Sequence, residues 1–202
     1  MRVVLAGTGT GVGKTFVASA LLTAAHAAGL RVTAWKPIET GGDDDALALA
    51  ATGQPLWPTT YRFAPPISPH LAARRAGVAI DLGRLAMDAP ADPLLVECAG
   101  GLFTPVAEGS TNHDLAKLLA ADALWLVVRE RLGALHDAIA TTRAAIAGGR
   151  PVDALVVNTF GPTDESTGTN VAELRAILGI PTWNLTEAIA AFNQRLRSVG
   201  PG

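Results

Sequence analysis

Short apolar runs alternate along the chain with longer segments that are rich in Ala and Leu and often end at glycine. The apolar runs are continuous, which is typical of strands in a parallel sheet that is covered by helices on both faces. They predict strands at residues 2–6, 31–35, 94–97, 123–128, 152–158 and 180–185. The intervening segments predict helices at residues 14–28, 46–51, 69–77, 80–87, 112–120, 133–147, 169–178 and 186–197.

Strands that alternate with helices predict an α/β fold of three layers, with a mostly parallel sheet between two layers of helices. No internal repeat or linker-like stretch divides the chain, so we expect a single domain over residues 1–202. We expect irregular structure in three segments, at residues 38–45, 52–67 and 98–105. Ligands bind such sheets at the carboxyl ends of the strands. The polar residues that follow the strands should therefore share one edge: the first glycine loop, Lys36, Thr40, Asp45, Glu97, Arg129 and Asn158.

The first strand runs into a glycine-rich loop, Gly7 to Thr15, with the sequence GTGTGVGKT. A strand, such a loop, Gly-Lys-Thr and a helix in this order are typical of a phosphate-binding loop, or P-loop. Backbone N–H groups and the positive end of the helix hold phosphate oxygens, Lys14 can reach the terminal phosphates, and the Thr15 hydroxyl can ligate Mg²⁺. Five residues separate Gly7 from Gly13, one more than usual. The alternative is a glycine-rich turn with a chance Gly-Lys-Thr; the P-loop interpretation makes the expected fold P-loop NTPase-like.

Charged residues close two further strands and supply candidate chemistry. Thr15, Asp45 and Glu97 offer a hydroxyl and two carboxylates, which are the hard oxygen ligands that Mg²⁺ prefers. A second lysine, Lys36, joins Lys14, and two lysines suggest charge that develops on a transferring phosphoryl group or on an anionic substrate. Taken alone, Lys36 could be an exposed strand-end lysine and Asp45 a helix N-cap. Glu97 is harder to explain without a partner, because it closes an apolar strand.

Composition excludes several classes of function. Hydrophobic residues make up 49% of the chain and the net charge is -2, so no basic patch suggests nucleic acid or an acidic membrane as a partner. No apolar stretch approaches the roughly 20 residues of a membrane span, and the chain enters a strand at once, so we expect neither a membrane helix nor a signal peptide. The single cysteine, Cys98, excludes an internal disulfide, and we interpret it as a packing residue. We expect a soluble, cytoplasmic protein, with His26 and His113 on its surface.

Four motifs in order resemble those of the dethiobiotin synthetase family. They are the P-loop, Lys36-Pro37-Ile38-Glu39-Thr40-Gly41, Ser68-Pro69-His70-Leu71-Ala72-Ala73 and Val96-Glu97-Cys98-Ala99-Gly100-Gly101-Leu102. The resemblance extends from the first strand to about Asn158. It implies a homodimeric ATP- and Mg²⁺-dependent ligase of biotin biosynthesis. In that reaction 7,8-diaminopelargonate takes up CO₂ as a carbamate, the carbamate attacks the γ-phosphate of ATP, and the second amine closes the ureido ring.

The resemblance also implies roles for individual residues. Catalysis would fall to Lys14, Lys36 and Thr10, Mg²⁺ to Thr15, Asp45 and Glu97, and substrate contacts to Thr40 and Ser68, with Thr10 beside them. Asn158 would read the adenine, and the segment from Pro181 to Trp183 would lie near the base. The full set implied for the nucleotide is Gly11, Val12, Gly13, Lys14, Thr15, Asp45, Glu97, Gly100, Asn158, Pro181 and Trp183.

Three features depart from the family pattern. Cys98 replaces a usual glycine, which puts a side chain into a loop expected near the substrate, and Gly11 stands where some members have an acid. The segment 132–137 differs from the Gly-x-Ile-Asn-His that reaches the substrate carboxylate across the family's dimer. The preceding Arg129 or Arg131 could bind that carboxylate instead, or both could be merely solvated.

Two alternatives stay open beside the ligase. One is a P-loop switch ATPase of the partitioning or metal-chaperone kind, which acts through nucleotide-dependent dimerisation. Such switches usually have a further lysine five residues before Lys14, where this chain has Gly9. The other is a related ligase that acts on a different amine or carboxylate.

Overall fold

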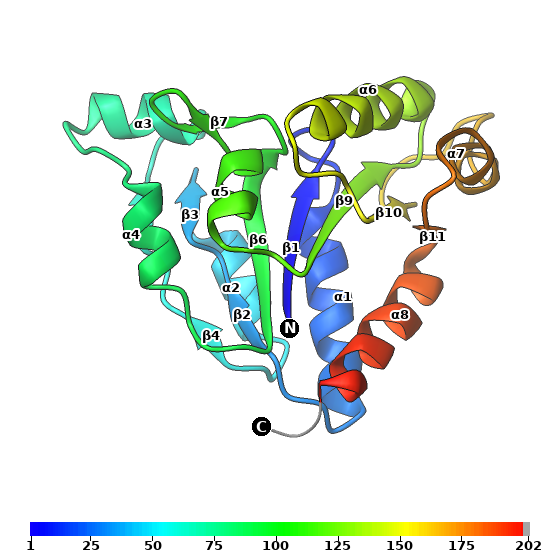
Figure 1. Cartoon of the computed structure of the whole chain (residues 1–202), viewed down its shortest axis with the longest axis horizontal. Helices are drawn as coiled ribbons and strands as arrows, with labels where there is room; N and C mark the ends of the chain where they lie inside the picture. Colours follow the sequence, from blue (N-terminus) through cyan, green and yellow to red (C-terminus); the bar gives the residue numbers. More distant parts are fainter. Residues whose placement is uncertain (200–202) are drawn as a thin grey trace.

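The continuous apolar runs form the strands of one sheet. In a computed structural model that describes residues 1–199, seven strands lie in the order β11-β10-β9-β1-β6-β2-β4, and every neighbouring pair is parallel (Figure 1). The strands are β1 (Arg2–Gly7), β2 (Thr33–Trp35), β4 (Leu56–Trp57), β6 (Leu94–Gly101), β9 (Ala123–Arg129), β10 (Ala154–Asn158) and β11 (Thr182–Trp183).

Helices cover both faces of the sheet, which confirms the predicted three-layer α/β fold. Successive residues of a strand point to opposite faces, so Val3 and Leu5 pack in one hydrophobic core and Val4 in the other. The first core is closed by α1 (Lys14–Ala27), α2 (Asp44–Ala50) and α8 (Leu185–Ser198). The second is closed by α3 (Pro69–Arg75), α4 (Leu82–Met87), α5 (Asn112–Leu118), α6 (Ala134–Ala147) and α7 (Asn170–Leu178). Burial on both faces is the physical reason why these strands show no polar alternation.

Three segments expected to be irregular contain strands instead. Residues 38–40 form β3 (Ile38–Thr40), which pairs in parallel with β5 (Tyr61–Phe63), and β4 lies in the same proline-rich connection. Residues 98–101 continue β6, and β7 (Pro105–Ala107) pairs with β8 (Ser110–Thr111) as a short antiparallel hairpin. These strands are two or three residues long, or rich in small residues, so their sequence carries little periodicity.

The topology brings the strand ends that carry polar residues to one edge of the sheet. The strands run in parallel, so the loop after β1, the end of β2 and the end of β6 lie at the same side, below α3 and α6 in the view of Figure 1. Among residues 1–199, no helix has the length and apolar character needed to cross a membrane.

Candidate active site

The P-loop connects β1 to α1, and Asn158 at the end of β10 packs against it and bonds to it. Gly13 has a φ of 88°, a left-handed conformation that favours glycine. A Cβ atom at Gly13 would come 2.0 Å from Nδ2 of Asn158, so this position has no room for a side chain. The same Nδ2 donates a hydrogen bond to the Val12 carbonyl oxygen at 3.0 Å. Because the Val12 side chain points into the core, only the backbone of that residue is available to a ligand.

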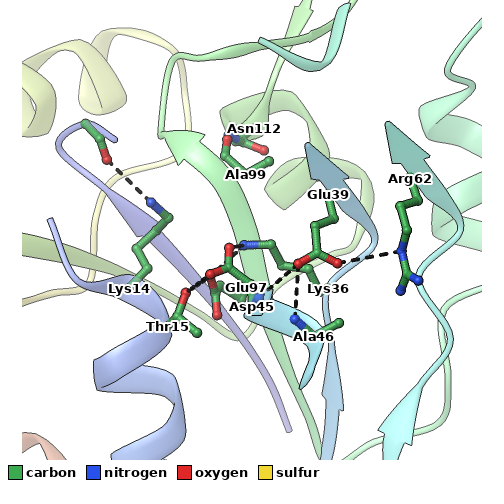
Figure 2. Close-up of polar contacts among 11 residues, drawn as sticks. Lys14, Thr15, Lys36, Glu39, Asp45, Ala46, Arg62, Glu97, Ala99 and Asn112 are labelled. Atoms are coloured by element: carbon green, nitrogen blue, oxygen red, sulfur yellow. Dashed lines mark hydrogen bonds and ion pairs between the residues drawn. The ribbon is translucent and has the colours of Figure 1, made fainter. Parts of the chain in front are cut away.

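An ionic cluster that is only partly exposed lies beside the P-loop (Figure 2). Lys36 follows β2, and its Nζ lies 2.5 Å from Oδ2 of Asp45 and 2.6 Å from Oε1 of Glu97. The Thr15 hydroxyl lies 2.7 Å from Oδ1 of Asp45 and 2.8 Å from Oε1 of Glu97, and can donate its one proton to either. Lys36 is 2% exposed and Glu97 is 1% exposed. Four residues that are distant in sequence thus form one network in which opposite charges compensate.

Glu39 supports this cluster from the neighbouring strand, β3. Its Oε1 accepts hydrogen bonds from the backbone N–H groups of Asp45 at 3.0 Å and of Ala46 at 3.1 Å. These groups belong to the first turn of α2, where backbone donors lack partners within the helix and a negative charge is favourable. Asp45 therefore lies in the first turn rather than at the N-cap, which is Asp43. Sequence reasoning gave Glu39 no part, although it lies in the Lys36-Pro37-Ile38-Glu39 motif.

The electrostatics of the cluster follow from burial and charge. Burial and the neighbouring charge of Lys36 lower the pKa of Lys14. Burial alone would also lower the pKa of Lys36, but the charges of Glu97 and Asp45 outweigh it and raise that pKa. Burial works against ionised Asp45, yet Lys36 and the Thr15 hydroxyl hold its pKa below the ordinary value. Lys36 and Asp45 are therefore charged at neutral pH.

A cleft of about 730 Å³ opens at this edge of the sheet. This volume is within the usual range for small-molecule sites, about 300–1,000 Å³. Ten predicted site residues line the cleft: Thr10, Gly11, Gly13, Lys14, Thr15, Lys36, Thr40, Asp45, Ser68 and Gly100. An apolar wall completes it, with Phe16, Pro66, Ile67, Pro69, Ala99, Pro105 and Phe160 among its residues.

Known proteins match this chain along most of its length. The family described as AAA domain matches residues 1–187. The ATP-dependent dethiobiotin synthetase BioD of Pseudomonas aeruginosa (strain UCBPP-PA14) is 36% identical over 221 residues, which covers 97% of this chain and 96% of that protein. The protein of the same name from Anaeromyxobacter dehalogenans (strain 2CP-C) is 38% identical over 182 residues, with 83% and 81% covered. The chain belongs to the dethiobiotin synthetase family.

Solved structures share the fold at lower identity. A ParA family ATPase from Chlorobium tepidum TLS superposes with a TM-score of 0.57 at 15% identity, over 99% of this chain and 92% of that one. The signal recognition particle receptor FtsY from Elizabethkingia anophelis, in complex with GDP, gives a TM-score of 0.57 at 19% identity. That match covers 95% of this chain and 63% of the receptor. At these identities the likeness extends to the fold alone.

Cys98, one of the departures from the dethiobiotin synthetase pattern, has no effect on the cleft surface. Cys98 belongs to β6 and not to a loop, and it is fully buried in the core on the face opposite Glu97. The expectation that it packs is confirmed, and the concern that it enters the substrate loop was wrong. Burial raises the pKa of its thiol to about 12.

His113 was expected at the surface but is buried, with its Nε2 2.9 Å from the Arg150 carbonyl oxygen.

Several predicted residues lie outside the cleft lining. Glu97 does not line the cleft, but its carboxylate contacts Lys36 and Thr15, which do. Asn158 is 1% exposed, and its amide is engaged by the Val12 carbonyl oxygen and the Phe160 N–H. Pro181 precedes β11 and therefore lies at the amino ends of the strands, the edge opposite the P-loop.

Pro181 and Trp183 line a second cavity of about 700 Å³, with Arg175 and Glu187. The Trp183 ring packs against Trp125 at 5.0 Å between centroids. Pro181 and Trp183 therefore lie outside the cleft that contains the P-loop.

The charged segment after β9 also turns away from the cleft. Arg131 pairs with Asp137 at 2.8 Å. Arg129 lies against Gly161, where a Cβ atom would come 2.4 Å from Nη2 of the arginine. Neither arginine lines the cleft, so the structure does not bring them to a substrate carboxylate there.

The Ser68 hydroxyl is not used as a helix cap, although Ser68 occupies the N-cap position of α3 with Pro69 next to it. Its side chain accepts no capping hydrogen bond from that helix, and the residue lines the cleft. The predicted start of this helix at Pro69 is confirmed, and Ser68 makes no capping hydrogen bond to it.

Proposed function

We propose that this protein is an ATP-dependent cyclo-ligase that converts 7,8-diaminopelargonate and CO₂ to dethiobiotin. One observation carries the proposal beyond family membership. A P-loop lysine and a second buried lysine, Lys36, line one cleft, and Lys36 pairs with the carboxylates of Asp45 and Glu97. A nucleotide alone requires the P-loop; the second lysine suits a reaction in which an anionic substrate approaches the γ-phosphate.

The reaction that we propose begins from the carbamate that the substrate amine forms with CO₂. A carbamate oxygen attacks the γ-phosphorus of ATP, the bond from that phosphorus to the bridging oxygen breaks, and ADP leaves. The second amine then attacks the carbamate carbon, loses a proton, and inorganic phosphate leaves as the ureido ring closes. Lys14 and Lys36 stabilise the negative charge on the oxygens of the transferring phosphoryl group, since fixed cations in a water-poor site act strongly on developing charge. Both lysines are buried.

Thr15, Asp45 and Glu97 fit a magnesium ion. Oε2 of Glu97 is buried and has no hydrogen-bond partner among the described residues, although the oxygen next to it is paired. Within residues 1–199, no group of three or more His, Cys, Asp or Glu side chains is arranged to hold a metal alone. A hydroxyl and two carboxylates match the small protein share of ligands for a nucleotide-bound Mg²⁺, which supplies charge neutralisation at the phosphates.

The substrate end of the cleft combines hydroxyls with an apolar wall. Thr10, Thr40 and Ser68 line it together with Ile67 and Pro105. Hydroxyls can hold the carbamate and the amines, and the apolar wall suits the aliphatic chain of the diamine. Gly11 lines the cleft as well, with a φ of 72° and open space around the position of a Cβ atom. We assign no contact with the substrate amine to Gly11, since it has no side chain.

We further propose that the whole chain acts as one domain in the cytoplasm and as a homodimer. Leu132, at the start of the segment that reaches across the dimer in the family, is 78% exposed, and a partner would cover it. Light scattering that finds only monomers at assay concentrations would contradict the dimer.

The proposed reaction is tested by incubating the protein with ATP, Mg²⁺, bicarbonate and 7,8-diaminopelargonate. We expect dethiobiotin, detected by mass, together with one ADP and one phosphate for each product molecule. Isotope-labelled bicarbonate should place its carbon in the ureido group. ATP hydrolysis without dethiobiotin, or hydrolysis that needs a macromolecular partner, would overturn the proposal in favour of a switch ATPase.

A further inference from the structure

The carboxyl end of β6 bulges where it passes the cleft. Between two successive pairings in the sheet, β1 advances two residues, from Leu5 to Gly7. Over the same length β6 advances four residues, from Glu97 to Gly101, so it contains two extra residues. The bulge includes Gly100, which has a φ of 73° and lines the cleft. The backbone of this bulge is therefore part of the wall that a ligand meets.

The side chain of Asn112 holds the bulge from the core side. Asn112 is the first residue of α5, and its amide lies beside Ala99 at the end of β6 (Figure 2). Its Nδ2 donates hydrogen bonds to the carbonyl oxygens of Ala99 at 2.7 Å and of Gly101 at 2.8 Å. The residue is 1% exposed, and its Oδ1 has no hydrogen-bond partner among the described residues. The two donations to the bulge are thus the hydrogen bonds that this side chain makes within residues 1–199.

These donations fix the direction of the peptide groups that accept them. In a trans peptide group the C=O and N–H bonds point in opposite directions. The carbonyl of Gly101 points to Asn112, and the N–H of the same peptide group, which belongs to Leu102, donates to the carbonyl oxygen of Gly7 at 2.8 Å. One side of this peptide group is therefore bonded to α5 and the other to the first residue of the P-loop.

The peptide group between Ala99 and Gly100 is held in the same way. Its carbonyl points to Asn112, so its N–H, which belongs to Gly100, points away from Asn112. We propose that Asn112 is a positioning residue, whose amide keeps the Gly100 N–H directed into the cleft as a donor to the transferring phosphoryl group. A backbone donor that is oriented before the reaction stabilises charge that develops in the transition state. The inference rests on the proposed function in that a phosphoryl group leaves a nucleotide in this cleft.

The start of α5 does not depend on the Asn112 amide. Thr111 is the N-cap, and Thr111 and Asp114 form a capping box at this end of the helix. The backbone N–H of Asn112 donates to the carbonyl oxygen of Thr104 at 3.3 Å, a bond that any residue except proline can make. We therefore expect substitutions of the Asn112 side chain to leave the helix in place and to release the bulge.

The first test is the steady-state kinetics of Asn112→Leu, which keeps a similar volume but has no donor. We expect kcat and kcat/KM for the diamine to fall by the same factor, about tenfold to a hundredfold, because the donor acts in the transition state. The affinity for ATP, measured by titration calorimetry without diamine, should not change, and the binding stoichiometry counts the folded sites. Asn112→Ala removes the donors without steric demand and should give the same result if leucine does not fit.

Gln54→Leu is the matched control. Nε2 of Gln54 also bridges two backbone carbonyl oxygens, those of Leu30 at 2.7 Å and of Leu22 at 3.5 Å, and the residue is 7% exposed. Gln54 precedes β4, so it lies near the amino ends of the strands, and it does not line the cleft. This variant should lose thermal stability and keep the kcat of the unchanged protein. An equal fall of kcat in both variants would show that Asn112 has only a structural role.

The second test needs no diamine. Mg²⁺-ADP with aluminium fluoride imitates a phosphoryl group in transfer, and transition-state analogues report interactions that the ground state lacks. Asn112→Ala should weaken the binding of ADP with aluminium fluoride by about tenfold to a hundredfold and leave the binding of ADP alone unchanged. An unchanged affinity for the analogue, or an equal loss for ADP alone, would overturn the assignment. Because neither ligand contains the diamine, these titrations decide the role of Asn112 even if no dethiobiotin forms.

Discussion

The two walls of the cleft differ in almost every physical property. On one side, Lys36, Asp45 and Glu97 form an ionic network in which the lysine and Glu97 are buried. On the other side, Phe16 and Phe160 form an apolar pair that is largely open to solvent. The ionic wall comes from the residue after β2, the middle of β6 and the start of α2, and the aromatic wall comes from α1 and the loop after β10.

The difference reflects what each wall has to do. Charges act strongly on a reacting phosphoryl group only where water is excluded, and buried charges must be compensated in the resting protein. Here the carboxylates compensate Lys36, and the same carboxylates are candidate ligands for a metal. An apolar surface gains its free energy from contact with other apolar groups, so it can remain exposed until a ligand covers it. We therefore expect substitutions in the ionic wall to affect catalysis and substitutions in the aromatic wall to affect affinity.

The largest effect should follow from Lys36→Ala. We expect turnover to fall by about 10²–10³-fold or more, because one fixed charge at the transferring group is lost, while ATP affinity changes little. Thermal unfolding should also show a loss of stability, since the carboxylate of Glu97 stays buried without its partner.

Lys36→Met tests the charge while keeping most of the side-chain volume, and it should lose turnover to the same extent. Lys117→Ala is the matched control, because Lys117 forms a surface pair with Asp114 at 2.9 Å and lies outside the cleft. Full turnover in Lys36→Ala would contradict the assignment of the ionic wall to catalysis.

Glu39 should have an intermediate effect as a positioning residue. Glu39→Ala removes the acceptor that holds the first turn of α2, and with it the position of Asp45. We expect turnover to fall by about 10–100-fold, by analogy with residues that orient metal ligands, together with a higher KM for Mg²⁺.

Glu39→Gln keeps an acceptor oxygen and should recover part of the loss, which a simple packing defect would not do. Arg62→Ala is the control, since Arg62 is exposed and its Nε lies 3.9 Å from Oε2 of Glu39, so their pairing contributes little. An unchanged Mg²⁺ dependence in Glu39→Ala would remove Glu39 from the site.

The smallest effect on activity should come from substitution of Cys98, which follows Glu97 in β6 but lies in the hydrophobic core. Its thiol is fully buried with a pKa of about 12, so a thiol reagent at pH 8 should label the protein only after denaturation. Above pH 9.0, the ordinary pKa of the group, the unfolded chain loses a proton that the folded protein keeps, so stability falls as the pH rises from 9.0 towards about 12.

Cys98→Ala should lack this contribution to the pH dependence, measured by denaturant unfolding at pH 8 and pH 10.5, and should retain turnover. Rapid labelling of the native protein would contradict the burial of Cys98 in the core.

Strand β6 shows most clearly which parts of the structure follow from the sequence and which do not. Its apolar run predicts the strand and places Glu97 near the carboxyl end. The run does not reveal that residues 98–101 continue the strand, because Gly100 and Gly101 are weak strand formers. Gly101 pairs with Gly7 of β1, and a Cβ atom there would come 3.2 Å from Cα of Gly9. Only the neighbouring strand explains why small residues follow Glu97.

The sequence by itself determined the layered α/β fold, the P-loop and the identity of the reactive groups, because each depends on a local pattern of apolar, glycine and charged residues. The tertiary structure alone decided which of these groups meet. It paired Asn158 with Val12 across 146 positions of sequence, turned Cys98 into the core, placed Glu39 under α2 and stacked Phe16 on Phe160. Such contacts depend on the order of the strands in the sheet and on the face to which each side chain points. The pattern of residues within one segment specifies neither the strand order nor the neighbours on that face.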